Sequence, residues 1–235
     1  MDSILNGIKV IGFDADDTLW INEPYFQEVE EKFCQLFSNK HSAKEVSAEL
    51  FSVEMQNLPS YGFGVKAFTL SLVETALRLD KECATAKIKQ ILELGRSILG
   101  KPVVLLDGVH KVLEQLKGRY RLIVATKGDL LDQQRKLKKS GLTHYFHHVE
   151  IMSDKRESDY KTLVDHLAIQ PENFLMVGNS FKSDILPVLS LGGKGIYVPY
   201  HVTWQHEVVE DSVADYSACI KLESLSDLLT ILEKN

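Results

Sequence analysis

Short apolar runs alternate with amphipathic stretches along most of this chain. Four runs have the continuous apolar character of buried strands, namely residues 8–13, 122–125, 174–177 and 195–198, and a weaker strand is expected at 148–152. Helices are expected between them at residues 107–116, 130–139, 160–167 and 182–191, with Asp107 capping the first. This alternation predicts an α/β fold, with a doubly wound, Rossmann-like parallel sheet covered by helices on both faces.

Residues 23–100 interrupt the alternation, because their apolar positions recur only at helical spacing. Four helices are expected there, around residues 26–37, 46–58, 68–77 and 88–94, and Pro24 suits the first turn of the first helix. Tyr61–Gly64 contains two glycines and predicts a flexible corner between helices. We therefore expect an all-helical insertion at 23–100 within an α/β core formed by residues 1–22 and 101–235.

Polar segments follow four of the predicted strands. Parallel α/β sheets bind their ligands at the carboxyl ends of the strands, so these segments are expected to meet at one edge of the sheet. They are residues 14–18, 126–129, 153–155 and 179–184. The sequence therefore predicts a single site assembled from distant parts of the chain.

The first segment carries two carboxylates, Asp14 and Asp16, directly after a buried strand. A carboxylate at Asp14 can attack phosphorus and form an acyl-phosphate, and Asp16 can protonate the leaving oxygen and later activate water. Two close carboxylates also bind a divalent cation. The alternative is that Asp14, Asp16 and Asp17 are turn residues that cap a helix.

The second and third segments offer groups that suit a phosphoryl oxygen. Thr126 supplies a hydroxyl and neighbouring backbone N–H groups, and Lys127 is a further candidate for phosphate binding. A buried ammonium at Lys155 would neutralise charge on a nucleophile and on an anionic substrate. Lys161 is the other lysine that could take the role of Lys155. The alternatives are that Thr126 only ends a strand and that the lysines are solvated at the surface.

The fourth segment runs from Gly178 to Asp184. Gly178 permits a close approach of the backbone, and Asn179 and Asp184 carry oxygens that can bind a cation. The alternative is a helix start, with Asn179 or Ser180 as the cap and Asp184 favourable in the first turn. The two interpretations are compatible.

In this order, the four segments resemble the motifs of the haloacid dehalogenase superfamily, a large group dominated by phosphatases. The matching residues are Asp14-Ala15-Asp16-Asp17-Thr18, Thr126, Lys155, and Gly178-Asn179 with Asp184. Lys155 matches better than Lys161 because it precedes Asn179 by 24 residues (179 − 155), close to the family's usual interval, whereas Lys161 precedes it by 18. The helical insertion is similar to the family's cap, so the resemblance covers the whole chain.

The resemblance implies a Mg²⁺-dependent phosphomonoester hydrolase that acts on a small phosphorylated metabolite. Asp14 would be the nucleophile that forms an aspartyl-phosphate, and Asp16 the general acid and base. Thr126 and Lys155 would bind the transferring phosphoryl group. Mg²⁺ would be held by the Asp14 carboxylate, the Asp16 backbone carbonyl and the fourth motif.

The chain departs from the family pattern at one position. The phosphatases usually have Gly-Asp where this chain has Gly178-Asn179. An amide oxygen can bind Mg²⁺ but carries no charge, so weaker Mg²⁺ binding is expected unless Asp184 compensates, directly or through a bound water.

Three other functions remain open. The dehalogenases of the family lack the second acidic residue of the first motif, so Asp16 argues against dehalogenation. Phosphoryl transfer to another acceptor, as in a mutase, is not distinguished by the sequence. Asn179 favours a non-catalytic domain, whereas the retention of Asp14, Asp16, Thr126 and Lys155 argues against one.

The composition and charge of the chain limit its possible binding partners and its location in the cell. The net charge of −6 argues against nucleic acid as a partner, and no apolar run approaches the length of a membrane span. A strand pattern begins within the first ten residues, which leaves no room for a signal peptide. Three widely spaced cysteines predict reduced thiols. We therefore expect a cytoplasmic enzyme.

Overall fold

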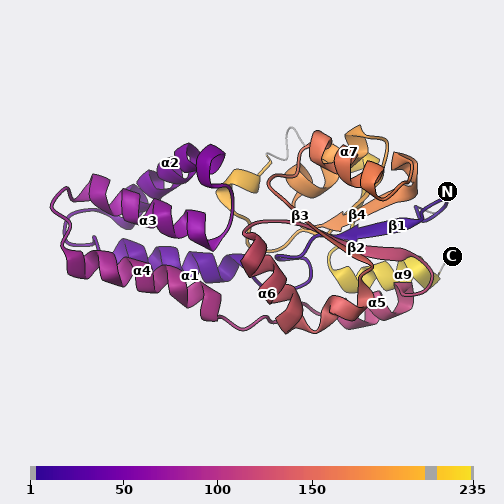
Figure 1. Cartoon of the computed structure of the whole chain (residues 1–235), viewed down its shortest axis with the longest axis horizontal. Helices are drawn as coiled ribbons and strands as arrows, with labels where there is room; N and C mark the ends of the chain where they lie inside the picture. The colour runs from indigo at the N-terminus through magenta and orange to yellow at the C-terminus, as the bar shows by residue number, and fades with distance from the viewer. Residues whose placement is uncertain (1–3, 210–215, 234–235) are drawn as a thin grey trace. The chain divides into compact units, whose positions relative to one another are not determined.

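The chain divides into two compact units in the computed structural model, which describes residues 4–209 and 216–233 (Figure 1). The first, here called the α/β unit, comprises residues 1–23, 103–126 and 135–235. The second, the helical unit, comprises residues 24–102 together with 127–134. The sequence predicts that residues 127–134 belong to the α/β core, whereas the structure places them in the helical unit.

A six-stranded sheet forms the centre of the α/β unit within the described residues. Its strand order is β3-β2-β1-β4-β5-β6, and β1 pairs in parallel with β2 and β4, as does β5 with β4 and β6. The strands are β1 (Val10–Phe13), β2 (Arg121–Lys127), β3 (His148–Met152), β4 (Phe174–Gly178), β5 (Lys194–Tyr197) and β6 (Ile220–Lys221). The predicted doubly wound α/β fold is confirmed.

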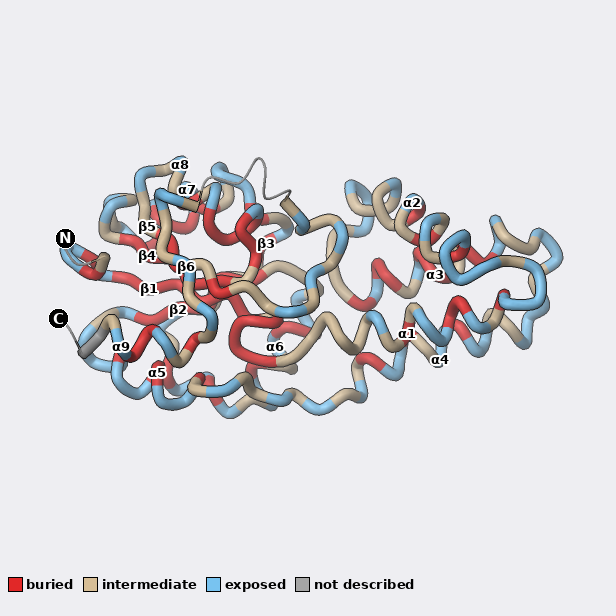
Figure 2. Tube along the Cα trace, turned by 180° about the vertical axis from the view of Figure 1, so that it is seen from behind, coloured by how far each residue is buried: buried red, intermediate tan, exposed pale blue. Residues whose placement is uncertain are grey.

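Alternate residues of the strands pack against helices on opposite faces of the sheet. One face packs against α5 (Val109–Leu116) and α9 (Leu228–Glu233), through Ile11, Phe13, Leu122, Val124, Leu175 and Val177. The other packs against α7 (Glu157–His166) and α8 (Leu186–Ser190), through Val10, Ile123, Ala125, Phe174 and Met176. Figure 1 shows α5 and α9 on the side of the sheet opposite α7, and Figure 2 shows the central strands as buried. Burial on both faces explains why these strands are continuous apolar runs.

The helical unit contains the four helices that the sequence predicts. They are α1 (Glu23–Gln35), α2 (Ala43–Tyr61), α3 (Val65–Leu79) and α4 (Thr85–Gly100). Their apolar stripes meet in a separate core that includes Val29, Phe33, Leu50, Leu72 and Ile91. Ser42 begins α2 with a capping box, in which its hydroxyl accepts from the Glu45 N–H and its own N–H donates to the Glu45 carboxylate.

Residues 127–134 belong to the helical unit because they contact the corner between α2 and α3. Lys66 Nζ lies 2.8 Å from Asp129 Oδ2, and Lys127 Nζ lies 4.2 Å from the centre of the Phe63 ring. Gly64 has a φ of +100°, and a Cβ there would lie 2.8 Å from the Asp129 backbone nitrogen. The corner therefore requires glycine at position 64 both for its backbone conformation and for the approach of Asp129.

One local prediction is wrong, and a second differs from the structure in the type of its first helical turn. Asp107 does not cap the helix that follows it, because α5 begins after Gly108, which has a left-handed φ of +80° and provides no side-chain cap. A Cβ at Gly108 would lie 2.1 Å from Ser226 Oγ, so glycine is needed there for close packing. The helix expected at 182–191 begins instead with a π-helical turn, Phe181–Ile185, and continues as α8.

The short β6 and α9 near the end of the chain are not predicted by the apolar pattern. Across the described part of the chain, every helix is too short or too polar to cross a membrane.

Candidate active site

Asp14 lies at the end of β1 and is tied to the neighbouring strand. Its backbone N–H donates to the Val177 carbonyl of β4 at 2.9 Å. Its carboxylate is buried, and Thr18 Oγ1 donates to Asp14 Oδ2 at 3.1 Å. The strand end therefore places a carboxylate where solvent reaches little of it.

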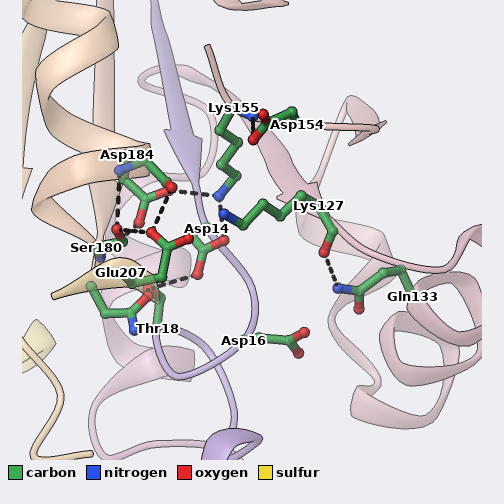
Figure 3. A network of polar contacts seen from close by, with 12 residues as sticks. Asp14, Asp16, Thr18, Lys127, Gln133, Asp154, Lys155, Ser180, Asp184 and Glu207 are labelled. Carbon is green, nitrogen blue, oxygen red and sulfur yellow. Dashed lines mark hydrogen bonds and ion pairs between the residues drawn. The ribbon is translucent and has the colours of Figure 1, made fainter. Parts of the chain in front are cut away.

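A buried lysine joins two carboxylates at this edge of the sheet. Lys155 Nζ lies 2.5 Å from Asp14 Oδ1 and 2.6 Å from Asp184 Oδ1, and Figure 3 shows the three side chains pointing toward one another. All three are at least 95% buried, with exposed fractions of 5% for Asp14, 4% for Lys155 and 1% for Asp184. Lys161 instead lies on the exposed face of α7 and pairs with Asp165 at 2.9 Å. The structure thus brings Lys155, and not Lys161, to the predicted cluster.

The charges in this cluster do not balance. Burial raises the pKa of the Asp14 carboxyl to about 7, while Lys155 acts to lower it and Asp184 adds to the rise. Burial also acts to lower the pKa of Lys155, but the two carboxylates outweigh that effect and raise it well above its ordinary value. Lys155 supplies one positive charge to two buried carboxyl groups, so a further cation here would stabilise the ionised form of Asp14.

Asn179 follows β4 and its amide lies beside oxygens of the first motif. One terminal atom of the amide lies 3.1 Å from Asp14 Oδ2, 3.2 Å from the Asp16 carbonyl oxygen and 3.2 Å from Thr18 Oγ1. An amide nitrogen satisfies this position, because its two N–H bonds can donate to two of these oxygens, whereas an amide oxygen would face other acceptors. With the amide oxygen turned inward, oxygens of Asn179, Asp14 and Asp16 converge, which is the donor set of a hard divalent cation.

Both carboxylate oxygens of Asp184 already have partners within the protein. Its Oδ1 contacts Lys155, and its Oδ2 accepts from the Ser180 backbone N–H at 2.9 Å. A Cβ at Gly178 would lie 2.3 Å from Asp184 Oδ2, so glycine allows this carboxylate to lie against the backbone, as the sequence predicts. Among the described residues, no three His, Cys, Asp or Glu side chains are grouped to hold a metal, so a cation here would depend on the Asn179 amide and the Asp16 carbonyl.

The Asp16 carboxylate lies apart from the Asp14 cluster in Figure 3 and has its own partners. Lys136 Nζ donates to Asp16 Oδ1 at 2.7 Å and to Oδ2 at 2.8 Å, and Trp20 Nε1 donates to Oδ1 at 2.7 Å. Lys136 also donates to Asn22 Oδ1 at 3.0 Å. Sequence reasoning missed Lys136, because only the phase of α6 (Leu130–Ser140) separates it from the exposed Lys138 and Lys139.

Asp17 has the turn role that the sequence assigns to it. It has a left-handed φ of +63°, and its carboxylate accepts from the N–H groups of Asn22 at 2.8 Å and Glu23 at 2.9 Å. Burial raises the pKa of this carboxyl to about 7. Asp17 therefore fixes the segment through which the chain enters α1.

Thr126 and Lys127 end β2, but they belong to different units. Thr126 is buried in the α/β unit. Lys127 belongs to the helical unit, where its ammonium lies over Phe63 and its carbonyl accepts from Gln133 Nε2 at 2.9 Å. The two residues that the sequence pairs as phosphate ligands are therefore supported by different sets of contacts.

Glu207 is a second residue that sequence reasoning missed. Its Oε2 accepts from Ser180 Oγ at 2.5 Å and from Ser183 Oγ at 2.6 Å, and both serines lie in the fourth motif. Figure 3 shows its side chain directed toward Ser180. Nothing in the sequence spacing of Glu207 marks it as a neighbour of the fourth motif.

Two phosphatases are similar to this chain in sequence, and a solved structure is similar to it in fold. The chain is 25% identical over 203 residues to the N-acylneuraminate-9-phosphatase of Mus musculus, covering 81% of this chain and 82% of that protein. It is 24% identical over 234 residues to the glyceraldehyde 3-phosphate phosphatase of Pyrococcus furiosus, covering 97% and 94%. The solved structure of a haloacid dehalogenase-like family hydrolase from Xanthomonas campestris superposes with a TM-score of 0.85 at 32% identity, covering 97% of this chain and 91% of that one.

The chain thus combines a doubly wound sheet with a buried Asp14–Lys155–Asp184 cluster at the strand ends, and the family model that matches it is that of a hydrolase. A family model matches residues 8–192, which includes all four motifs. The chain belongs to the haloacid dehalogenase-like hydrolases.

Proposed function

We propose that this protein is a Mg²⁺-dependent phosphomonoester hydrolase that acts on a small phosphorylated metabolite through an aspartyl-phosphate. The observation that carries the proposal is the position of Asp14, at a strand end between Lys155 Nζ on one carboxylate oxygen and Thr18 Oγ1 on the other. A carboxylate held from both sides is oriented for attack on phosphorus. The phosphatase activity of the two relatives named above supports this reaction.

Asp14 would form a bond to phosphorus as the bond from phosphorus to the ester oxygen breaks. Asp16 would give its proton to the leaving oxygen. In the second half, Asp16 would take a proton from water as the water oxygen attacks phosphorus, releasing inorganic phosphate and free Asp14. Lys136 and Trp20 donate to the Asp16 carboxylate and fix its direction, so one Asp16 oxygen would have to leave its donor before it carries the proton.

Lys155 and Thr126 would bind the transferring phosphoryl oxygens, and Lys127 is a further candidate. Lys155 is suited to this role because its ammonium is already desolvated and fixed between two carboxylates. Thr126 supplies a buried hydroxyl at the end of β2.

The residues present fit a Mg²⁺ ion. Asp14 Oδ2, the Asp16 carbonyl oxygen and the Asn179 amide would hold it, with Asp184 as a candidate through a bound water. When bound, the ion would screen the repulsion between Asp14 and an anionic phosphate ester.

The test is turnover of 4-nitrophenyl phosphate and of phosphorylated metabolites, with release of inorganic phosphate measured in Mg²⁺ and in EDTA. Asp14→Asn should abolish release, and Asp165→Asn, at an exposed position on α7, should leave it intact. Borohydride reduction of an aspartyl-phosphate yields homoserine, which mass spectrometry would locate at position 14. Turnover that persists in Asp14→Asn would refute the proposal, and product without matching phosphate release would indicate transfer to another acceptor.

A further inference from the structure

Glu207 places a carboxylate beside the fourth motif. A single oxygen, Oε2, accepts from both Ser180 Oγ and Ser183 Oγ. Ser180 in turn receives the Ser183 N–H at 3.0 Å and donates its own N–H to Asp184. Glu207 is thereby connected through one residue to Asp184, and Ser180 is the neighbour of Asn179 in the chain.

The hydrogen bonds of Ser180 and Ser183 do not require a charged acceptor. A glutamine at position 207 has nearly the same shape and an oxygen that accepts from both hydroxyls. The segment around Glu207 has its own backbone contacts, since the Glu207 N–H donates to the Trp204 carbonyl at 2.9 Å and Lys182 Nζ donates to the His206 carbonyl at 2.7 Å. The position of this segment is therefore accounted for without the charge of the Glu207 side chain.

The negative charge of Glu207 corresponds to a charge that Asn179 lacks. Asn179 offers the converging amide described above, but it brings no negative charge to the Asp14 and Asp16 oxygens. Glu207 brings one negative charge to the same motif, because it contacts Ser180, the residue that follows Asn179 in the chain. A negative charge near a cation site attracts a divalent cation without binding it directly.

We propose that Glu207 supplies, from outside the ligand shell, the negative charge that Asn179 lacks toward a Mg²⁺ ion held by Asp14, the Asp16 carbonyl and Asn179. This inference rests on the proposed Mg²⁺-dependent function. It makes Glu207 a positioning and charge-balancing residue of the cation site, and it makes Asn179 and Glu207 parts of one arrangement.

Titration of the purified protein with MgCl₂ by calorimetry tests the proposal without using activity. Glu207→Gln should weaken Mg²⁺ binding by roughly tenfold. Asn179→Asp should strengthen it, and the double variant Asn179→Asp/Glu207→Gln should return to about the affinity of the wild type, because it carries the same net charge. Glu223→Gln, at an exposed position, is the control and should bind Mg²⁺ as the wild type does.

The outcomes separate this inference from the proposed function. Wild-type protein that binds no Mg²⁺ would overturn both. Wild-type affinity in Glu207→Gln would overturn the inference alone. Weak binding in Glu207→Gln that Asn179→Asp fails to restore would also overturn it, because the effect would then come from the fold of the segment. Unfolding in EDTA checks the fold, since Glu207→Gln should retain the thermal midpoint of the wild type.

Discussion

Lys136 holds both carboxylate oxygens of Asp16, at 2.7 Å and 2.8 Å. Two contacts from one ammonium, with the Trp20 indole on one of the same oxygens, fix the direction of this carboxylate. The Asp16 carboxylate is 22% exposed and Lys136 is 16% exposed, so the pair is shielded from much of the solvent. This contact is therefore stronger than an ordinary surface ion pair.

Lys136→Met should impair the delivery of the Asp16 proton. An alkyl phosphate, whose leaving oxygen needs protonation, should lose about tenfold or more in kcat/KM, because general acid catalysis contributes about 10²–10⁴-fold when fully intact. 4-Nitrophenyl phosphate, whose leaving group needs little protonation, should lose much less. The parameter to compare is kcat/KM because, in the proposed mechanism, it reports the steps up to formation of the aspartyl-phosphate.

Lys136→Arg should recover part of the loss, since it retains the charge. Lys139→Met, at an exposed position of α6, is the matched control and should leave both substrates unaffected. An equal loss for the two substrates in Lys136→Met would argue against a role in proton delivery.

Lys155→Met should destabilise the fold as well as abolish turnover. It leaves the buried carboxylates of Asp14 and Asp184 without their cation, and breaking a buried ion pair costs about 3–5 kcal/mol in the free energy of unfolding. Lys161→Met removes an exposed pair with Asp165 and should cost about 1 kcal/mol or less. Urea unfolding of the two variants measures this difference, and similar costs would show that burial of Lys155 contributes little.

Asn179→Ala and Asp184→Ala should affect Mg²⁺ differently. The Asn179 amide lies against Asp14 and the Asp16 carbonyl, whereas Asp184 is bound to Lys155 and the Ser180 N–H. Asn179→Ala should therefore raise the Mg²⁺ concentration needed for half-maximal activity by about tenfold or more. Asp184→Ala should mainly lower kcat, through the misplacement of Lys155. The reverse pattern would assign the direct ligand to Asp184.

Tyr160→Phe should stabilise the protein in alkaline solution. The Tyr160 hydroxyl is buried and has no hydrogen-bond partner among the residues that the structure describes, and burial raises its pKa well above the ordinary value. Above about pH 10 the unfolded chain ionises this tyrosine and the folded chain does not, so the wild type loses stability as the pH rises.

Tyr160→Phe should not show this loss of stability at high pH. Its free energy of unfolding should be equal to that of the wild type or about 1 kcal/mol higher at pH 8, and the difference should grow by about 1.4 kcal/mol per pH unit above pH 10. Urea titrations between pH 8 and pH 11 provide the measurement. Parallel curves for the two proteins would contradict the assignment of a raised pKa.

The sheet and the Asp14, Lys155 and Asn179 positions could be predicted because they depend on local signals. A strand buried on both faces is a continuous apolar run, and polar residues directly after it lie at its carboxyl end whatever the rest of the chain does. Only the spacing to Asn179 that is usual in the family favours Lys155 over Lys161 in the sequence. The structure agrees, because Lys161 lies on the exposed face of α7.

Lys136 and Glu207 could not be predicted because their roles depend on contacts distant in sequence. Lys136 meets Asp16 only through the phase of α6, and Glu207 meets Ser180 only through the path of the chain after β5. Gly108 was missed for a similar reason, since its partner Ser226 belongs to a part of the chain with little apolar pattern.

The boundary between the two units falls between Thr126 and Lys127, and again after Gln134. The helical unit is therefore not a simple insert that can be exchanged through the junctions at residues 23–24 and 102–103. A chimera that takes residues 24–102 from another protein would separate Lys66 from Asp129 and Phe63 from Lys127. Among homologues, substitutions in the second motif's loop should therefore accompany substitutions in the corner between α2 and α3.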